Sequence, residues 1–252
     1  MSKAGSPLRI ATLLPELLGT YGDGGNAMVL ARRARLRGIE VAEFAVSRGD
    51  AVPDADIYLL GGGEDGPQVA ASLWLAQHAD LASRLANGAV VLGVCAGFQI
   101  LGEYFPAHDG AHQAGLGLLD MSTERGGEKR CVGELAAAID PAFDESQSWL
   151  SGFENHAGRT SLGEDLKPLG RVLRGVGNGG SLGTEGAWTQ QIVGTYLHGP
   201  VLARNPVLAD KLLAMANPAF AEGEIEDGTA LLREERRASL GLKSAGLSGH
   251  DG

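Results

Sequence analysis

Over its first hundred residues, the chain alternates short apolar runs with longer stretches of helical periodicity. The apolar runs predict strands and the longer stretches predict helices. We expect strands at 9–14, 39–46, 56–60 and 89–94, and helices at 26–37, at 67–85 and directly after Cys95. Residues 89–94 (AVVLGV) are apolar throughout, which is typical of a strand buried on both faces. The pattern therefore predicts an α/β fold in which a mostly parallel sheet is flanked by helices.

The second half is less regular, and glycine- and proline-rich turns separate its apolar runs. Strands are expected at 116–120, 130–139, 149–155, 169–174 and 191–196, and a helix at 205–216. Beyond Pro218 the composition becomes charge-rich, with a weak helical pattern over 222–240 and a predicted disordered tail at 241–252. We predict one domain at 1–218 and a charged, partly disordered C-terminal extension at 219–252.

Composition narrows the classes of function. The 252 residues include 21 basic and 31 acidic side chains, so the formal charge is −10, and no basic patch predicts nucleic-acid binding. The two cysteines have no repeated spacing, which argues against a disulfide framework or a zinc site and indicates a reducing compartment. No apolar run reaches the length of a membrane span. The sequence predicts a cytoplasmic protein without a metal site.

Cys95 is the first candidate for chemistry. It ends the apolar run 89–94, lies between glycines in GVCAG (93–97), and directly precedes a helix. This is the cysteine version of the strand–turn–helix nucleophile elbow. The sulfur would stand at the carboxyl end of a strand, and the helix N-terminus would favour the thiolate. A buried structural cysteine is the alternative, but the elbow glycines favour a nucleophile.

Two backbone N–H groups are candidates for stabilising an oxyanion beside Cys95. The N–H of Ala96 would point to where the oxyanion forms. Three glycines at 61–63 end the strand at 56–60, which we expect next to the Cys95 strand. Gly62 would there let a second N–H face the substrate. A flexible turn is the alternative for these glycines.

His198 is the leading candidate for the base among six histidines. It follows the strand at 191–196 and is flanked by Gly199 and Pro200, so it should share the sheet edge with Cys95. There it could activate the thiol and protonate a leaving amine. His156 is the runner-up base, and an ordinary loop histidine is the alternative for His198.

Arg130 opens the strand at 130–139 and could bind a substrate carboxylate in a bidentate fork. By itself, the residue is better read as a solvated arginine. Cys131 is expected to be a packing residue.

Several segments together resemble the class I glutamine amidotransferases. The elbow GVCAGFQILG at 93–102 is shared by the whole class. The more specific segments are GLGLLD at 115–120, GFENHAGRT at 152–160 and GTYLHGP at 194–200. They resemble a subgroup that includes cobyric acid synthase and the glutamine-hydrolysing subunit of lipid II isoglutaminyl synthase. YGDGGN at 21–26, and Arg130 between GLGLLD and GFENH, are most similar to the latter.

The resemblance implies roles that the residues alone do not establish. It implies that Cys95 is the nucleophile, that His198 is the base and that Arg130 helps to hold L-glutamine. It also implies that the ammonia passes to a synthetase of the Mur-ligase type (a MurT subunit). That partner would use ATP to amidate the α-carboxyl of D-glutamate in lipid II, a step in peptidoglycan synthesis. No cofactor is expected in this chain itself.

One departure from the class concerns the acid that orients the histidine. Many class I enzymes carry a glutamate two residues after the histidine, where this chain has Pro200. Glu154 and Asp120 are possible substitutes, but no spacing selects either. The most economical expectation is an acid from the synthetase partner, so that the isolated subunit would hydrolyse glutamine slowly.

Three alternative functions are compatible with the same residues. The chain could serve another amidation, such as cobalamin-precursor synthesis, although no synthetase domain is fused to it. It could also be a non-catalytic module on the same fold, against which Cys95 and His198 argue. The third alternative is a cysteine peptidase or hydrolase of similar α/β build.

Overall fold

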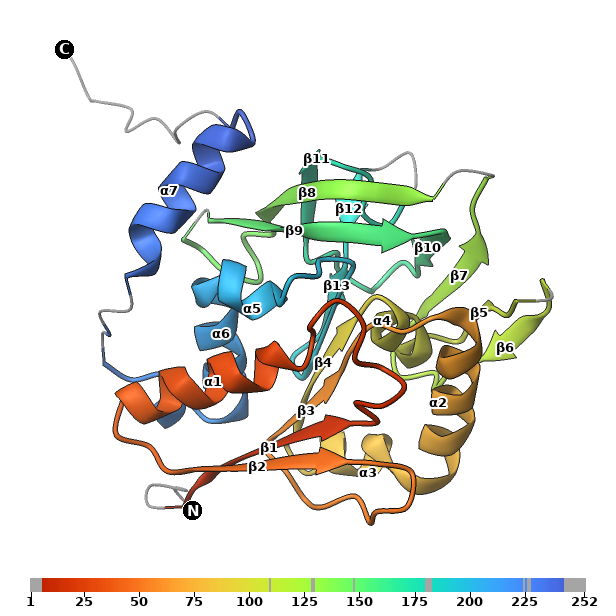
Figure 1. Ribbon diagram of the computed structural model, residues 1–252, viewed down its shortest axis with the longest axis horizontal. Helices are drawn as coiled ribbons and strands as arrows, with labels where there is room; N and C mark the ends of the chain where they lie inside the picture. The colour runs from red at the N-terminus through yellow and green to blue at the C-terminus, as the bar shows by residue number, and fades with distance from the viewer. Residues whose placement is uncertain are drawn as a thin grey trace.

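The computed structural model describes residues 6–108, 110–127, 130–146, 148–179, 183–223, 225 and 228–242. A six-stranded sheet of order β13-β14-β4-β3-β1-β2 forms the lower part of the molecule in Figure 1. All neighbouring strands in it are parallel except β13, which runs antiparallel to β14. The strands are β1 (Leu8–Leu13), β2 (Val41–Val46), β3 (Ile57–Leu60), β4 (Val90–Val94), β13 (Ala187–Trp188) and β14 (Ile192–Thr195). The predicted parallel sheet is thus confirmed.

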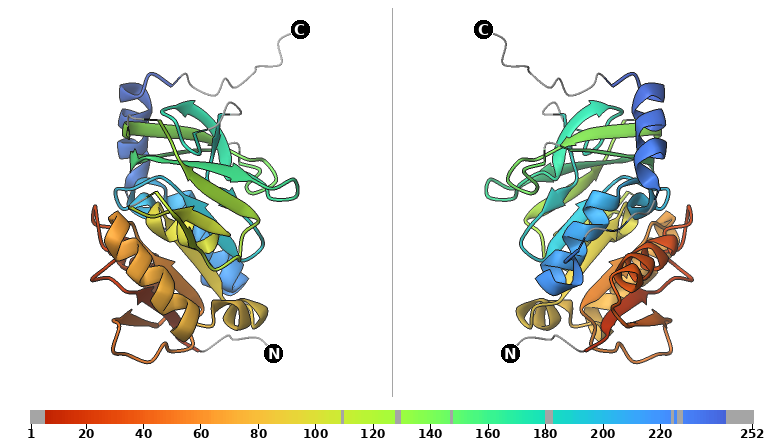
Figure 2. Two further views of the ribbon diagram at one scale, coloured as in Figure 1. Left: turned by 90° about the vertical axis from the view of Figure 1, so that its right-hand side faces the viewer. Right: turned by 90° about the vertical axis from the view of Figure 1, so that its left-hand side faces the viewer.

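Helices flank this sheet (Figure 2). Helix α1 (Gly25–Leu36) packs with α5 (Val201–Arg204) and α6 (Pro206–Ala216), whereas α2 (Asp65–His78) packs with α4 (Ala96–Leu101). The helix predicted over 67–85 is broken, and α3 (Leu81–Ala86) is a separate element. The break occurs at Asp80, whose left-handed backbone (φ 44°) ends the helical path while its carboxylate accepts the Ser83 N–H.

Two further sheets, largely antiparallel, are built from strands within residues 104–185 and lie above the first in Figure 1. One has the order β10-β7-β5-β6 and the other β12-β11-β8-β9. The strands of the first are β5 (Tyr104–Pro106), β6 (His112–Ala114), β7 (Met121–Arg125) and β10 (Gly158–Leu162). Those of the second are β8 (Cys131–Ile139), β9 (Trp149–His156), β11 (Gly170–Arg174) and β12 (Thr184–Glu185).

The strand predicted at 116–120 is wrong, because this segment caps α4 instead of joining a ladder. The N–H groups of Leu116 and Leu118 donate to the carbonyls of Ile100 and Leu101 at 2.7 and 2.9 Å. The last carbonyls of a helix have no partner inside it, so the segment supplies one from outside. The strand β7 begins only at Met121.

Helix α7 (Thr229–Ser239) in the C-terminal extension confirms the weak helical pattern over part of 222–240, and a short helix, η1 (Pro218–Phe220), precedes it. Arg233 attaches α7 to the rest of the molecule by donating to the carbonyls of Arg204 and Trp149 at 3.0 and 2.9 Å. Of the predicted tail, 243–252 lie outside the described residues. Within the described ranges, no helix is both long enough and apolar enough to cross a membrane.

Candidate active site

Cys95 and His198 lie at the carboxyl ends of two neighbouring strands. Strand β4 leads into Cys95 and pairs in parallel with β14, in the register Val94 to Thr195. The Cys95 N–H extends this pairing by donating to the Thr195 carbonyl at 2.8 Å. The two residues therefore share one edge of the sheet, as the sequence predicted.

The backbone at Cys95 has the strained geometry of a nucleophile elbow. Its φ of 51° and ψ of −102° are rare for a residue with a side chain, and such strain gathers at functional sites. The flanking glycines make the turn possible. A Cβ on Gly97 would lie 2.4 Å from the carbonyl oxygen of Leu60, and one on Gly93 only 2.7 Å from Leu101 Cδ1. The side chain of Cys95 is presented where β4 ends and α4 begins.

His198 has a carboxylate partner inside this chain, Asp23. Nδ1 of His198 lies 3.0 Å from Asp23 Oδ2, and both side chains are only 1% exposed. Among the described residues, the buried Nε2 of His198 has no hydrogen-bond partner. Burial disfavours the imidazolium, but the hydrogen bond to Asp23 and the interaction with Cys95 outweigh it and raise the pKa of His198 to about 10. The site thus favours the imidazolium form of His198.

Asp23 reaches His198 because the segment 21–26 (YGDGGN) packs on the turn that follows β14. Gly25 lies so close to Pro200 that a Cβ on it would be 2.5 Å from the proline Cγ. The side-chain oxygen of Asn26 accepts the Leu202 N–H at 3.0 Å. The two glycine-containing motifs, far apart in sequence, therefore form one unit.

These contacts correct the expectation about the acid. The position next to Nδ1, expected to be filled by a partner subunit, is occupied by Asp23. Glu154 instead accepts the backbone N–H groups of Val176 and Gly177 at 2.9 and 3.0 Å. Asp120 is exposed and lies before β7, where its carbonyl accepts the Gly163 N–H. The sequence did contain a signal for Asp23, an acid in a glycine-rich segment after β1.

The runner-up base, His156, is held on both sides of its ring. Nδ1 lies 3.1 Å from the Gly158 carbonyl and Nε2 lies 3.4 Å from Glu154 Oε2, while the ring stacks on Tyr196. Both nitrogens are engaged, so neither is available to act as a base. His156 instead lines the cavity.

The expectation for Gly62 is also corrected. Its N–H does not face a substrate but donates to Asp23 Oδ2 at 2.8 Å. Gly63 and Ala96 line the cavity that contains Cys95. In the part of the chain that the structure describes, their N–H groups have no hydrogen-bond acceptor.

Arg130 lines the same cavity as Cys95, so the structure brings these two predicted residues together. The exposed guanidinium is held by Asn155, with Nε donating to the side-chain oxygen at 3.0 Å and an NH2 donating to the main-chain oxygen at 3.2 Å. Gln99 also lines this cavity, and its side chain joins Gln68 to the hydroxyl of Tyr196. The cavity therefore combines a nucleophile with a cation and amide groups. Cys131 is buried in β8, as expected for a packing residue.

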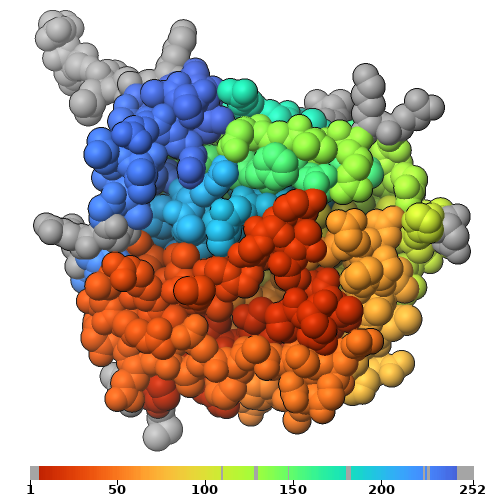
Figure 3. Space-filling model, viewed as in Figure 1, coloured from red at the N-terminus to blue at the C-terminus, as the bar shows by residue number. Residues whose placement is uncertain are grey.

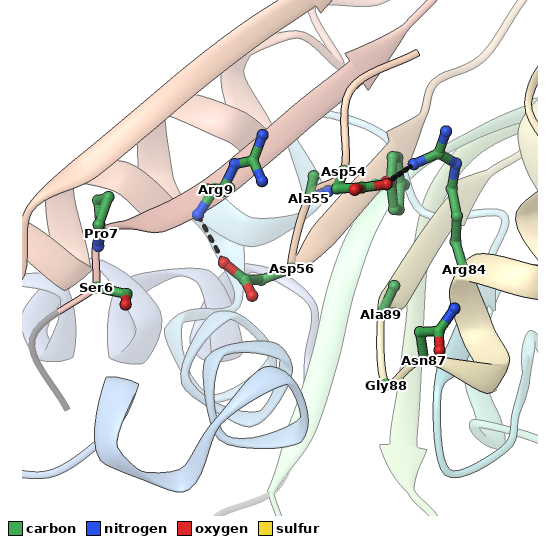
Figure 4. A pocket seen from close by; sticks show the side chains of 11 residues that line it. Ser6, Pro7, Arg9, Asp54, Ala55, Asp56, Arg84, Asn87, Gly88 and Ala89 are labelled. Atoms are coloured by element: carbon green, nitrogen blue, oxygen red, sulfur yellow. Dashed lines mark hydrogen bonds and ion pairs between the residues drawn. The ribbon is translucent and has the colours of Figure 1, made fainter. Parts of the chain in front are cut away.

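A second cavity lies at the opposite, amino-terminal edge of the sheet (Figure 4). Arg84 lines it but is engaged by Asp54 at 2.6 Å and by the carbonyls of Val52 and Ala79 at 2.9 and 2.7 Å. Neither cysteine lines this cavity. The chemistry is therefore assigned to the Cys95 edge.

Comparison with known proteins agrees with this geometry. Residues 9–206 match the CobB/CobQ-like glutamine amidotransferase domain. The chain belongs to this family. This membership makes it a glutamine amidotransferase, and the match includes Cys95 and His198.

Two relatives of this amidotransferase are subunits named GatD of lipid II isoglutaminyl synthase (glutamine-hydrolyzing). The one from Streptococcus pneumoniae is 38% identical over 212 residues, 83% of this chain and 80% of the relative. That from Staphylococcus aureus is 35% identical over 83% of this chain and 84% of the relative. A probable cobyric acid synthase from Methanothermobacter thermautotrophicus is 34% identical, but over only 64% of this chain and 33% of the relative.

A solved structure has the same fold as this amidotransferase. A protein described as a glutamine amidotransferase superposes with a TM-score of 0.56 at 18% identity, over 82% of this chain and 98% of the other. At this identity the likeness shows the fold alone.

Proposed function

We propose that this amidotransferase is the glutamine-hydrolysing subunit of lipid II isoglutaminyl synthase. It would release ammonia from L-glutamine for a synthetase of the Mur-ligase (MurT) type, which amidates D-glutamate of lipid II. The observation that carries the proposal is the Cys95–His198–Asp23 arrangement opening into a cavity with Arg130. The similarity to two such subunits over 83% of the chain supports the choice of acceptor.

In the first half of the reaction, the Cys95 thiolate attacks the side-chain amide carbon of glutamine. The carbonyl oxygen becomes an oxyanion, for which we propose the N–H groups of Ala96 and Gly63 as donors. The His198 imidazolium gives its Nε2 proton to the amide nitrogen as the C–N bond breaks. Ammonia leaves, and a glutamyl thioester remains on Cys95.

In the second half, water attacks the thioester while neutral His198 accepts a proton from it. The C–S bond breaks, glutamate leaves and the thiolate–imidazolium pair is restored. Asp23 keeps the Nδ1–H directed at its carboxylate, so that Nε2 always faces the sulfur, and it stabilises the imidazolium. The triad acts without a cofactor, and we assign ATP to the partner.

We propose that Arg130 binds the α-carboxylate of glutamine. Its guanidinium stands on the same cavity as Cys95, and Asn155 fixes its orientation. A planar fork held in this way suits a carboxylate.

The second candidate function is ammonia supply for a cobalamin precursor. The family match, which is named for CobB and CobQ, favours it. The chain spans about a third of the length of the cobyric acid synthase that it matches, so the similarity is confined to the glutaminase part.

The test is ATP-dependent transfer of label from [amide-¹⁵N]glutamine to lipid II by the complex purified from native cells. We expect ¹⁵N in the stem peptide with the wild-type chain and none with Cys95→Ala, whereas added ammonium should restore amidation in the variant. Labelling of a corrinoid instead of lipid II would support the second candidate. Label transfer by Cys95→Ala would contradict both.

A further inference from the structure

Tyr21 is an exposed aromatic residue in contact with the buried base. Its ring lies edge-on to the His198 imidazole, with centroids 4.9 Å apart and planes at 62°, although 43% of the tyrosine is exposed. Tyr21 lies in the segment between β1 and α1, which Figure 3 shows at the surface between the two layers of the molecule. The roles assigned above to Cys95, His198 and Asp23 do not use it.

The backbone of Tyr21 is held in a conformation that a tyrosine rarely adopts. Its φ is 61°, in the left-handed region that costs energy for a bulky side chain. Such a conformation persists only where its surroundings fix it. Here the Thr20 N–H donates to the Gly62 carbonyl at 3.1 Å, and Asp23 holds His198 on the other side. In this conformation the ring lies against His198.

The hydroxyl of Tyr21 connects this ring to Arg130. The side-chain amide of Asn155 donates a hydrogen bond to the Tyr21 hydroxyl, and the oxygen of the same amide accepts from Arg130 Nε at 3.0 Å. Asn155 can satisfy both only in one orientation, because one end of its amide donates and the other accepts. One short chain of contacts thus runs from the base to the guanidinium.

We propose that Tyr21 is a positioning residue that couples recognition of the substrate carboxylate to the catalytic base. Through Asn155 its hydroxyl fixes the Arg130 fork, and its ring limits the movement of the His198 imidazole. This inference rests on the proposed function, because Arg130 must bind a carboxylate. A substrate amide without an α-carboxylate would leave this link unused.

The experiment separates the hydroxyl from the ring. Tyr21→Phe keeps the ring and should raise the KM for glutamine about tenfold with kcat nearly unchanged, the size of effect expected from one lost hydrogen bond. Tyr21→Ala should lower kcat as well, by roughly tenfold or more, because the imidazole is no longer held. Tyr104→Phe is the matched control, since it removes another tyrosine hydroxyl bond, to Glu124 at 2.9 Å, outside the site.

A double substitution decides whether Tyr21 acts through Arg130. In an Arg130→Ala background, Tyr21→Phe should cause no further rise in KM. Asn155→Ala should reproduce the KM effect of Tyr21→Phe by a second route. An equal rise in KM in both backgrounds, or Tyr21→Phe behaving like Tyr104→Phe, would overturn the inference.

Labelling of Cys95 keeps this inference distinguishable from the proposed function. A diazoketone analogue of glutamine carries the carboxylate and iodoacetamide does not. Tyr21→Phe should slow labelling by the analogue and leave alkylation by iodoacetamide unchanged. Equal slowing of both reactions would contradict the connection from Tyr21 to Arg130 but would leave the proposed glutamine hydrolysis unaffected. A wild-type chain that iodoacetamide alkylates but the analogue does not label would contradict the proposed function, and this inference with it.

Discussion

His198 and His156 lie in similar surroundings, yet only one is arranged as a base. Both rings are buried, and each has a carboxylate beside it, Asp23 at 3.0 Å and Glu154 at 3.4 Å. Each also packs against a tyrosine ring. Burial and a nearby carboxylate are therefore not sufficient to identify a catalytic histidine.

The difference lies in the second ring nitrogen. His156 directs it to the Gly158 carbonyl at 3.1 Å, so the ring serves as a structural bridge. In the described part of the chain, Nε2 of His198 has no hydrogen-bond partner, and the ring interacts with the side chain of Cys95. A nitrogen left free next to a nucleophile is what distinguishes the base.

The largest expected effect comes from removing each histidine in turn. His198→Ala should lower kcat by at least about a thousandfold, because nucleophile and base act as a unit. His156→Ala should cost far less turnover and act mainly on stability. Steady-state ammonia release at equal folded concentration measures both, and a reversed order would show that His156 is the base.

Replacing each of the two carboxylates by its amide tests the difference between the two histidines. Asp23→Asn should reduce kcat by about 10²–10⁴-fold, since the imidazole can then adopt the wrong tautomer. Glu154→Gln is the matched control and should leave kcat within about tenfold, because this carboxylate contacts His156 and two backbone N–H groups but not His198.

The pKa of His198 gives a second, non-kinetic test of the Asp23→Asn variant. In the wild-type protein the pKa of His198 is raised from 6.5 to about 10. The contact between His198 and Asp23 therefore stabilises the fold fully below pH 6.5, and this stabilisation is lost as the pH rises through about 10. In Asp23→Asn the His198 resonance should titrate at clearly lower pH by NMR. An unchanged titration would remove Asp23 from the site.

A smaller effect is expected at the other side of the cavity. Arg130→Lys keeps the charge but loses the planar fork, so the glutamine KM should rise by about tenfold while the alkylation rate of Cys95 stays the same. Arg125→Lys is the control, because Arg125 lines the same cavity but is not held by Asn155. Unchanged glutamine affinity in Arg130→Ala would exclude Arg130 from substrate binding.

The smallest effect concerns the free energy of unfolding and the buried carboxyl group of Glu185. Burial raises the pKa of Glu185 from 4.5 to about 7, although Thr195 and Tyr196 donate to its carboxylate. Between these pH values the unfolded chain ionises while the folded chain stays protonated, so stability should fall as pH rises from 4.5 to 7, by up to about 3 kcal/mol.

Urea unfolding at pH 5 and pH 6.5 measures this fall, because both values lie below the range in which His198 loses its contribution. Glu185→Gln should abolish most of it, whereas the exposed control Glu124→Gln should keep it. An equal fall in wild type and Glu185→Gln would show that another group is responsible.

Much of this architecture could be predicted from local sequence. Apolar runs such as 89–94 identified the strands of the parallel sheet, because residues buried on both faces leave a continuous apolar signal. Cys95 and His198 followed from that sheet, since Cys95 directly follows β4 and His198 lies three residues after the end of β14. The segment 116–120 misled the prediction because its apolar residues cap a helix.

Asp23 could not be placed from spacing. It lies 175 positions before His198, and only the packing of 21–26 on the turn after β14 brings the two together. The position two residues after the histidine holds Pro200, so the sequence led us to expect the acid from a partner subunit. The role expected for Gly62 failed for the same reason, because its N–H is taken by Asp23.

The most direct test of the account is the reaction of the purified chain with the diazoketone analogue of glutamine, followed by peptide mass spectrometry. We expect label on Cys95 and none on Cys131, and a labelling rate that collapses in His198→Ala and falls strongly in Asp23→Asn. Label mainly on Cys131, or a wild-type rate in Asp23→Asn, would contradict the claim that one chain supplies nucleophile, base and acid.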